Sequence, residues 1–480
     1  MRGRAGLPVK SLNVWKLDML TLLAFVVALA LLIAVHEYGH YRVAVACGIK
    51  VLKFSIGFGK PICTWQLKNK ATEFSIGMLP LGGYVKMLDE REAPVDPAER
   101  HLAFNTQPLK FRAAVVAAGP LANLLLAVLL YAIVNWSGMQ EPRAVLASPV
   151  VGSLAERAGL RGHETVVEAA FEGDEPQTVH SFEDLRWRLT QGALNGRDLT
   201  LILAGDSQGI AGPVLLPLSQ LGSPEADAQL FRKIGILGPW TEPVMGEILA
   251  GGAAEKSGLR VGDLVQRVDD IAIVDGQQLR EVIRAPAAAA ARPIGGRAAA
   301  PLPQRWQILR AGQPLVLQVT PQLRQEGELA VARIGAYVGA PPEFVMVRYG
   351  PLEGLWQGAV RTSEVSLLTL KMIGRMVIGQ ASVKNLSGPL TIAEYAGKSA
   401  SLGWTAYLLF LALISVSLGV LNLLPLPVLD GGHLMYYLCE WITGRSVSDA
   451  WMERLQRGGV AILLGMMCVA LFNDVTRLLG

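Results

Sequence analysis

The chain has 480 residues, of which 51% are hydrophobic and 18% are charged, and its formal net charge is +4. An ordinary soluble domain contains about 25% charged residues, and the mean hydropathy here is +0.36. This balance argues against a purely soluble enzyme, a disordered chain and a nucleic-acid-binding protein, because the positive charge is small and dispersed. The four cysteines form no C-x-x-C pair and predict no disulfide framework.

Four apolar segments predict transmembrane helices, since about 20 residues cross the hydrocarbon core of a bilayer. With their flanks, the predicted spans cover residues 17–46, 112–137, 402–425 and 457–477. The last apolar run is short, but its flanking arginines can extend to the membrane interface. Residues 1–16 form an N-terminal extension. The first segment is not read as a cleaved signal peptide, because ionisable residues follow its apolar run at once.

The first span contains the motif His36-Glu37-Tyr38-Gly39-His40. Positions i and i+4 share one face of a helix, so both imidazoles can bind one zinc ion. Glu37 lies about 100° around the helix, close enough to take a proton from the attacking water. We therefore predict His36 and His40 as zinc ligands and Glu37 as the catalytic base. Two surface histidines at a helix end are the alternative, disfavoured because ionisable groups beside a span are costly.

Residues 47–111, between the first two spans, contain two stretches with apolar residues at every second position. These stretches, from Leu52 to Phe58 and from Phe74 to Met78, predict strands of a hairpin-like sheet. A transmembrane substrate helix must unwind before cleavage, and an exposed strand edge can hold the unwound segment by β-addition. We expect a membrane-associated β element with this role. A small cytoplasmic β subdomain is the alternative.

The region after the second span contains a repeat with a period of about 99 residues. The pattern of residues 149–162 recurs at residues 243–263, and a period near 100 predicts two copies of a small domain. The copies, placed at 141–240 and 241–325, resemble tandem PDZ domains of the bacterial protease type. An Ala-rich surface insertion, 285–301, interrupts the second copy. Two unrelated turn-rich segments are the alternative.

Residues 326–398 are predicted to form an amphipathic helical linker. Within them, 352–380 carry an apolar face, with Lys371 and Arg375 four positions apart on another face. Two cations at this spacing make a poor span but suit a helix that lies at the membrane surface. A packed amphipathic helix in a soluble domain is the alternative.

The segment after the third span supplies a candidate third ligand, Asp430. The first and third spans run in the same direction, so His40 and Asp430 are expected at the same membrane face. Two imidazoles and one carboxylate leave a fourth coordination position open, as a catalytic zinc requires. Pro425 and Pro427 break the helix and free backbone groups that need a water-lined cavity. His433 is a rival ligand, more consistent with a place beside the site.

The distribution of lysine and arginine predicts the orientation. Residues 41–112 contain eleven of these cations, whereas the N-terminal tail contains four. The positive-inside rule therefore places the β region and the loop with its following segment, 426–456, in the cytoplasm. An even number of spans then places both termini, and the PDZ pair, on the extracytoplasmic side.

These motifs together resemble the site-2 protease family of intramembrane zinc metalloproteases, over nearly the whole chain. The resemblance is carried by residues 36–40, 119–123, 387–389 and 422–431 and by the paired PDZ domains. It implies that His36, His40 and Asp430 bind the metal, that Glu37 is the base and that Asn422 contacts the substrate backbone. Pro425 and Pro427, in the same segment, are further candidates for substrate binding.

We therefore expect a polytopic α-helical membrane protein with four transmembrane helices, a membrane-associated β element and two extracytoplasmic PDZ domains. The expected activity is that of a zinc metalloendopeptidase of the bacterial inner membrane, with one zinc ion per chain. The resemblance implies single-span substrates of the anti-sigma-factor type and remnant signal peptides, cleaved after ectodomain trimming. A catalytically silent PDZ-bearing scaffold and a zinc-dependent transporter are the alternatives. One departure is Gly162-His163-Glu164 in the first copy, where the second has Gly262-Asp263, and it weakens the case for peptide binding there.

Overall fold

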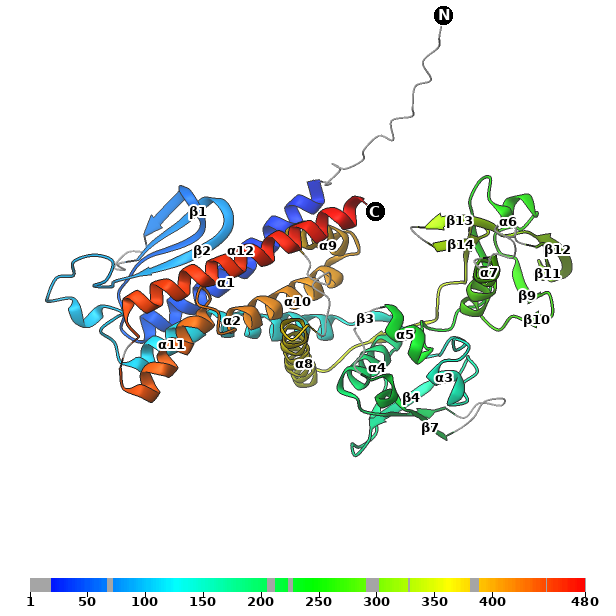
Figure 1. Ribbon diagram of the computed structural model, residues 1–480, viewed down its shortest axis with the longest axis horizontal. Coiled ribbons are helices and arrows are strands. Elements are labelled where there is room, and N and C mark those ends of the chain that lie inside the picture. The colour runs from blue at the N-terminus through cyan, green and yellow to red at the C-terminus, as the bar shows by residue number, and fades with distance from the viewer. Residues whose placement is uncertain are drawn as a thin grey trace, which may run out of the picture. The chain divides into compact units, whose positions relative to one another are not determined.

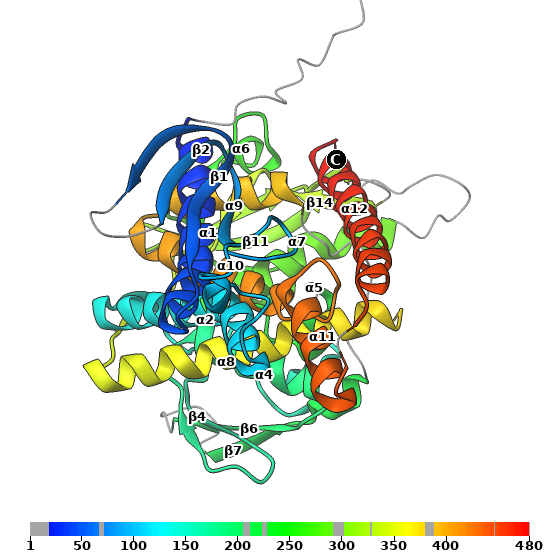
Figure 2. The same ribbon diagram turned by 90° about the vertical axis from the view of Figure 1, so that its left-hand side faces the viewer.

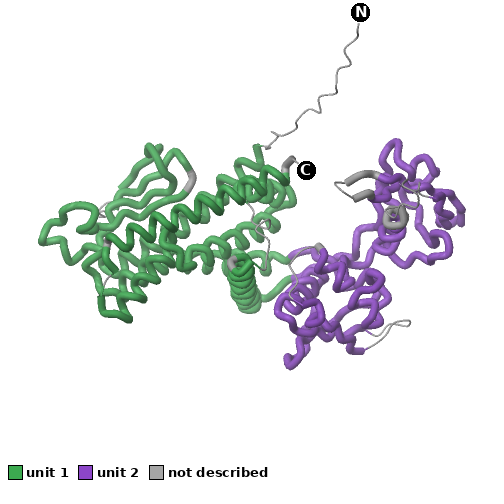
Figure 3. Tube along the Cα trace, viewed as in Figure 1, with its two compact units in different colours: residues 1–138, 348–480 green, residues 139–347 purple. Residues whose placement is uncertain are grey.

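The computed structural model describes residues 19–66, 72–204, 212–222, 228–290, 302–326, 329–379, 388–445 and 447–479. The chain divides into two compact units, residues 1–138 with 348–480 and residues 139–347 (Figure 3). The N-terminal extension and most of the Ala-rich insertion lie outside the described residues.

Within the described part of the first unit, four helices are long and apolar enough to cross a membrane. They are α1 (Met19–Ala46), α2 (Leu109–Ser137), α10 (Trp404–Asn422) and α12 (Asp449–Leu479). The start of α1 and the end of α12 lie at the same end of this unit (Figure 1). This arrangement agrees with an even number of crossings.

Two helix boundaries differ from those predicted by hydropathy. The helix α10 ends at Asn422 rather than at residue 425, because Leu424 precedes a proline and that position disfavours helical backbone. The helix α12 begins at Asp449 rather than at residue 457. Its polar first turns contain an i,i+4 ion pair between Arg457 and Glu453, 2.5 Å apart, which favours helix without adding hydropathy.

The helix α2 is central to this unit, because α1, α8 (Pro351–Val377), α10 and α11 (Asp430–Thr443) all contact it. Glycines permit three of these approaches. A Cβ at Gly39 of α1 would lie 2.4 Å from the Ala118 carbonyl oxygen, and one at Gly358 of α8 would lie 2.7 Å from that of Val128. A Cβ at Gly419 of α10 would lie 3.0 Å from Pro120 O. Side chains at these positions would push the helices apart.

The predicted amphipathic helix is observed as α8, the long yellow helix of Figure 2. It packs on α2 and α10 and belongs to the helical unit. The sequence predicted that the residues before α8 belong to a helical linker, and this prediction is wrong. They form the strands β14 (Leu329–Arg333), β15 (Ala336–Val338) and β16 (Phe344–Val347), which pair with strands of the second unit. Short β segments of this kind carry too little periodicity to be separated from a linker.

The far end of α12 is joined to the short helix α9 (Pro389–Ser401) by a buried carboxylate. Asp474 accepts hydrogen bonds from the backbone N–H groups of Gly388, Leu390 and Thr391 and from the Thr391 hydroxyl. It thus caps the N-terminus of α9 from another helix, where a negative charge is favourable.

The strands β1 (Val51–Gln66) and β2 (Glu73–Met87) pair antiparallel, as the alternating pattern predicted. Both bend, so Phe54 pairs with Phe74 on one side and with Val85 on the other. The register therefore gives four adjacent segments, in the order 83–87, 51–56, 73–76 and 63–66. Phe54 and Phe74 pack edge-on against Tyr41 of α1, which attaches the sheet to that helix. A short 3₁₀ turn, Arg100–Leu102, precedes α2.

The second unit contains two copies of one topology. In each, a short helix is followed by two strands, a longer helix and two more strands, and the sheet orders are β5-β4-β6-β7 and β10-β9-β11-β12. The first copy contains α3 (Leu154–Arg157), β4 (Val166–Phe171), β5 (Gln177–Thr178), α4 (Phe182–Asn195), β6 (Leu199–Leu203) and β7 (Gly212–Leu216). The second contains α6 (Ala253–Lys256), β9 (Leu264–Val268), β10 (Ile271–Ala272), α7 (Gly276–Ala290), β11 (Gln304–Arg310) and β12 (Gln313–Val319).

Each copy has its own hydrophobic core, around Phe182 and Leu189 in the first and around Leu279 and Trp306 in the second. The Ala-rich insertion falls between α7 and β11, outside the repeated strands, and its first residues continue α7. The remaining elements of this unit are β3 (Met139–Pro142), a 3₁₀ turn at Leu218–Leu221, α5 (Ala228–Ile234), β8 (Met245–Ile248) and β13 (Gln322–Glu326).

The two copies differ in sequence at one turn, which reads Gly162-His163-Glu164 in the first copy and Gly262-Asp263 in the second. In the second copy the buried Asp263 accepts a hydrogen bond from the Arg260 N–H, at 2.8 Å, and pairs with Arg310. In the first copy Glu164 takes this place, accepting from the N–H groups of Arg161 and Gly162 at 2.7 and 2.8 Å. The longer glutamate offsets the extra residue His163, which adopts a left-handed backbone conformation with φ of 76°. The turn is therefore preserved in both copies.

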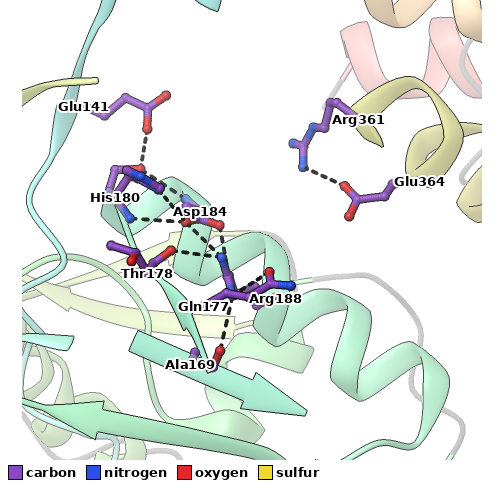
Figure 4. A network of polar contacts seen from close by, with 10 residues as sticks. Glu141, Ala169, Gln177, Thr178, His180, Asp184, Arg188, Arg361 and Glu364 are labelled. Atoms are coloured by element: carbon purple, nitrogen blue, oxygen red, sulfur yellow. Dashed lines mark hydrogen bonds and ion pairs between the residues drawn. The ribbon is translucent and has the colours of Figure 1, made fainter. Parts of the chain in front are cut away.

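The helix α4 of the first copy is fixed by a polar network (Figure 4). Asp184 lies between His180 and Arg188, 3.7 Å from the His180 Nδ1 and 3.0 Å from the Arg188 Nε. Ser181, the N-cap of α4, donates a hydrogen bond to Glu141 of β3. Burial raises the pKa of Asp184, but its hydrogen bonds to His180 and Arg188 outweigh that effect and lower the pKa below the usual value.

Candidate metal centre

Three predicted ligand residues meet at one point of the helical unit. His36, His40 and Asp430 each offer a ligand atom, and the three atoms lie within 4.8 Å of one another. The Nε2 atoms of the two imidazoles are 3.2 Å apart, and Asp430 Oδ2 lies 3.2 Å from one and 3.5 Å from the other. Two imidazole nitrogens and a carboxylate oxygen are a donor set of catalytic zinc sites. The residues present therefore fit a zinc ion.

The ring of His40 is oriented by α2. Its Nδ1 lies 2.8 Å from the backbone carbonyl oxygen of Val115. That oxygen can only accept, so Nδ1 carries the proton and Nε2 has the free lone pair that a metal requires. One turn further along α2, Gly119 lies directly against both imidazoles, because a Cβ there would lie 2.2 Å from His40 Nε2 and 2.8 Å from His36 Cε1.

Asp430 reaches the histidines because the chain turns sharply after α10. Residues 423–429 form a loop with its own backbone hydrogen bonds, from Leu426 N to Leu424 O and from Leu429 N to Leu426 O. Asp430 then begins α11, where a carboxylate is favoured by the helix dipole. Burial raises the pKa of Asp430, but its close contacts with the imidazoles of His36 and His40 outweigh that effect and lower the pKa to about 2. The group is thus a carboxylate at neutral pH.

Glu37 lies beside the three ligands and below the sheet. Its carboxylate is close enough to interact electrostatically with His36, His40 and Asp430. A Cβ at Gly83, in the outer segment of β2, would lie 2.8 Å from Glu37 Cγ. The outermost strand segment therefore passes directly over the predicted base.

The other predicted site residues lie at the break between α10 and α11. Asn422 is the last residue of α10 and is half-buried, and its side chain forms no hydrogen bond with another described residue. Pro425 is exposed and Pro427 half-buried in the loop that follows. His433 is not in the ligand group found among the described residues, and its ring packs edge-on against Tyr436, with centroids 5.9 Å apart.

Three residues of α2 that border the site were not assigned a role from the sequence. They are Val115, which binds His40, Gly119, which makes room for both rings, and Asn123, whose side chain lies 3.4 Å from His36 Nδ1. Gly119 and Asn123 both fall in the segment that carried the family resemblance. The sequence feature that could have identified them is their spacing of four on an apolar helix, which places a small and a polar residue on one face.

The family model described as peptidase family M50 matches residues 24–466. The chain belongs to peptidase family M50. Members of this family are the site-2 proteases, as the motifs of the sequence indicated. The M50 assignment makes this chain a zinc metallopeptidase and contradicts the alternative of a catalytically silent scaffold.

Relatives of this M50 peptidase match it along almost their whole length. The regulator of sigma-E protease RseP of Escherichia coli is 37% identical over 468 residues, which cover 95% of this chain and 98% of that protein. Protease RseP of Yersinia pestis is 36% identical, covering 95% and 99%. A protein of Ralstonia nicotianae, provisionally named a zinc metalloprotease, is 41% identical, covering 96% and 99%.

The close approach of α2 yields a test of the metal centre. We expect Gly119→Ala to abolish cleavage and to weaken zinc binding at least about tenfold, because the added methyl group displaces a ligand ring. Zinc content and affinity of the purified protein measure this effect. Gly465→Ala in α12 is the matched control, since a Cβ there would meet no atom of the described residues within 4 Å. Parent-like zinc binding by Gly119→Ala would show that α2 does not confine the site.

Proposed function

We propose that this M50 peptidase is an intramembrane endopeptidase that cleaves single-span membrane proteins in or near their transmembrane segment. One zinc ion per chain, held by His36, His40 and Asp430, would serve the reaction, with Glu37 as the base. The observation that carries this proposal is the meeting of the three ligand atoms within 4.8 Å inside a unit built of membrane-length helices.

A zinc ion held by these ligands would polarise the scissile carbonyl and acidify the attacking water. Glu37 takes the proton of that water and passes it to the leaving amine. The ligand side chains are 11% to 21% exposed, so the site is shielded but open to a substrate.

The outer strand segment of β2 is the proposed support for the substrate backbone. A transmembrane helix that unwinds in an apolar medium exposes N–H and C=O groups that need new partners. The edge at residues 83–87 offers such partners by β-addition, and it passes over Glu37. Asn422, Pro425 and Pro427 would contact the same extended segment from the loop side.

The sheet also carries features of a membrane-associated element. Large apolar side chains are exposed on it. They are Phe58, Ile62, Trp65, Met78 and Leu79, each at least 43% exposed. Exposed apolar side chains in this number are typical of a surface that contacts lipid or another protein.

The role of the base can be separated from that of the ligands. We expect Glu37→Gln to slow cleavage of a single-span substrate by at least about 100-fold, while zinc content stays at the parent level. Cleavage in a membrane co-expression assay and zinc analysis of the purified protein are the two measurements. Glu353→Gln, an exposed glutamate of α8, is the control. Turnover near the parent rate would remove Glu37 from the role of base.

For the location we propose the bacterial inner membrane, with both termini and the second unit extracytoplasmic. The parity of the four candidate spans and the excess of cations in residues 41–112 support this orientation.

Cysteine accessibility tests this orientation, in a variant whose four native cysteines are replaced. We expect Val151→Cys in the second unit, 87% exposed in the native chain, to react with an impermeant thiol reagent once the outer membrane is permeable. Ala93→Cys, in the exposed segment before α2, should react only after the inner membrane is opened. The reverse pattern would place the metal centre at the other face.

We further propose that the two copies in the second unit are PDZ domains that exclude substrates with a bulky ectodomain. Their identical sheet orders and the preserved turn at Glu164 and Asp263 support a pair of related domains. The protease would then act after another enzyme has trimmed the ectodomain. The relative RseP is named as a regulator of sigma-E, so we propose an anti-sigma factor as one candidate substrate and remnant signal peptides as a second candidate class.

Removal of the second unit tests the filter. Residues 143–343 can be replaced by a short linker that keeps the pairing of β3 with β16. We expect this variant to cleave a trimmed substrate at nearly the parent rate and also to cleave the untrimmed one. Both rates are read from product formation in cells. Loss of trimmed-substrate cleavage in a zinc-loaded variant would instead make the pair a required docking site.

A further inference from the structure

We propose that Asn123 is a positioning residue that holds the His36 ring with its proton on Nδ1, so that Nε2 is free to bind the metal. The inference rests on the proposed function, in which His36 is a ligand, and adds a residue of α2 to the reaction.

Both ligand histidines have the same requirement. Each binds the metal through Nε2, and in the neutral ring the proton then sits on Nδ1, where it needs a hydrogen-bond acceptor. His40 has one, the carbonyl oxygen of Val115 at 2.8 Å. A ring without such an acceptor would be free to place its proton on Nε2, where it blocks metal binding.

For His36, the polar group beside Nδ1 is the side-chain amide of Asn123. Its amide lies 3.4 Å from His36 Nδ1, and the residue is 1% exposed. Its oxygen, Oδ1, is buried and has no hydrogen-bond partner among the described residues. A half-turn of the amide exchanges its nitrogen and oxygen, which fill nearly the same space. The unpartnered oxygen then faces Nδ1 and accepts its proton.

The opposite arrangement is unfavourable on two counts. If the amide N–H donates to Nδ1, the proton of His36 must sit on Nε2, between His40 Nε2 and Asp430 Oδ2. The amide oxygen also stays without a donor, which is unfavourable for a buried acceptor. The half-turn frees His36 Nε2 and gives the amide oxygen a donor, while the N–H2 group takes the buried place that Oδ1 left.

The backbone of Asn123 is held in place independently of its side chain. Its carbonyl oxygen accepts a hydrogen bond from the Ser415 hydroxyl of α10, at 2.7 Å. Ser415 is fully buried. This contact offers a matched control, because its loss changes the same turn of α2 without touching the side-chain amide.

The test compares three substitutions in the full-length protein purified in detergent. Asn123→Leu removes the acceptor at similar volume, Asn123→Asp keeps an acceptor, and Ser415→Ala is the control. The measurements are zinc affinity by competition with a chelator and the thermal unfolding of the zinc-free protein. We expect Asn123→Leu to bind zinc about 10- to 100-fold more weakly, Asn123→Asp to stay within a few-fold of the parent, and Ser415→Ala to bind normally.

Rescue by aspartate separates positioning from mere packing, since a buried carboxylate would not restore an apolar contact. Parent-like zinc affinity in Asn123→Leu overturns the proposal, and so does an equal loss in Asn123→Asp, which would make the amide a donor. His36→Ala tests the proposed zinc ligands separately from the role of Asn123. If it loses zinc while Asn123→Leu does not, only the role of Asn123 fails. If it binds zinc as tightly as the parent, the proposed ligand set fails as well.

Discussion

The closeness of α1 and α2 is the constraint on which the rest of the helical unit depends. An apolar bundle must here enclose two imidazoles and two carboxylates, each of which needs a partner in a medium that supplies little water. Gly39 lets the backbone of α1 meet that of α2, and Gly119 leaves room for both rings. The Val115 carbonyl is then within reach of His40. A bundle with ordinary side chains at the two glycines would hold the helices too far apart for this contact.

The break after α10 brings the carboxylate of Asp430 close to the two ligand histidines. A helix that continued past Asn422 would carry the following residues away from the histidines. The turn at residues 423–429 redirects the chain, and its carbonyl oxygens accept from Leu426, Leu429 and Gly432. The exposed backbone of the break is therefore largely satisfied within the loop, as a position inside a membrane requires. Gly431 and Gly432 are part of the same solution, since a Cβ on either would lie within 2.3 Å of a loop carbonyl oxygen.

The spacing of His36 and His40 was sufficient to predict that both imidazoles share a face, because helical geometry is local. The strands around Phe54 and Phe74 also followed from a local pattern, and the two copies followed from the repeated sequence, whereas their common strand order is visible only in the structure. The neighbours of the ligands did not, since Val115 and Gly119 acquire their roles only through the crossing of α1 and α2. The strands at 329–347 were missed because short strands that pair with distant partners carry little periodicity of their own. The start of α12 at Asp449 was missed because hydropathy detects only the apolar part of a helix, and the first turns of α12 are polar.

The position of Gly83 connects the sheet to the chemistry of the site. A strand carries side chains alternately on its two faces, and any side chain at position 83 would collide with Glu37 Cγ and with the Ser55 carbonyl. Glycine therefore lets the edge of the sheet lie against the base with only backbone between them. A peptide added to that edge under the proposed function would run beside Glu37 in an extended conformation, with its own N–H and C=O groups paired. The cost of unwinding a substrate helix and the geometry of proton transfer would then be met by the same strand, which gives a physical reason for a β element within an otherwise helical unit.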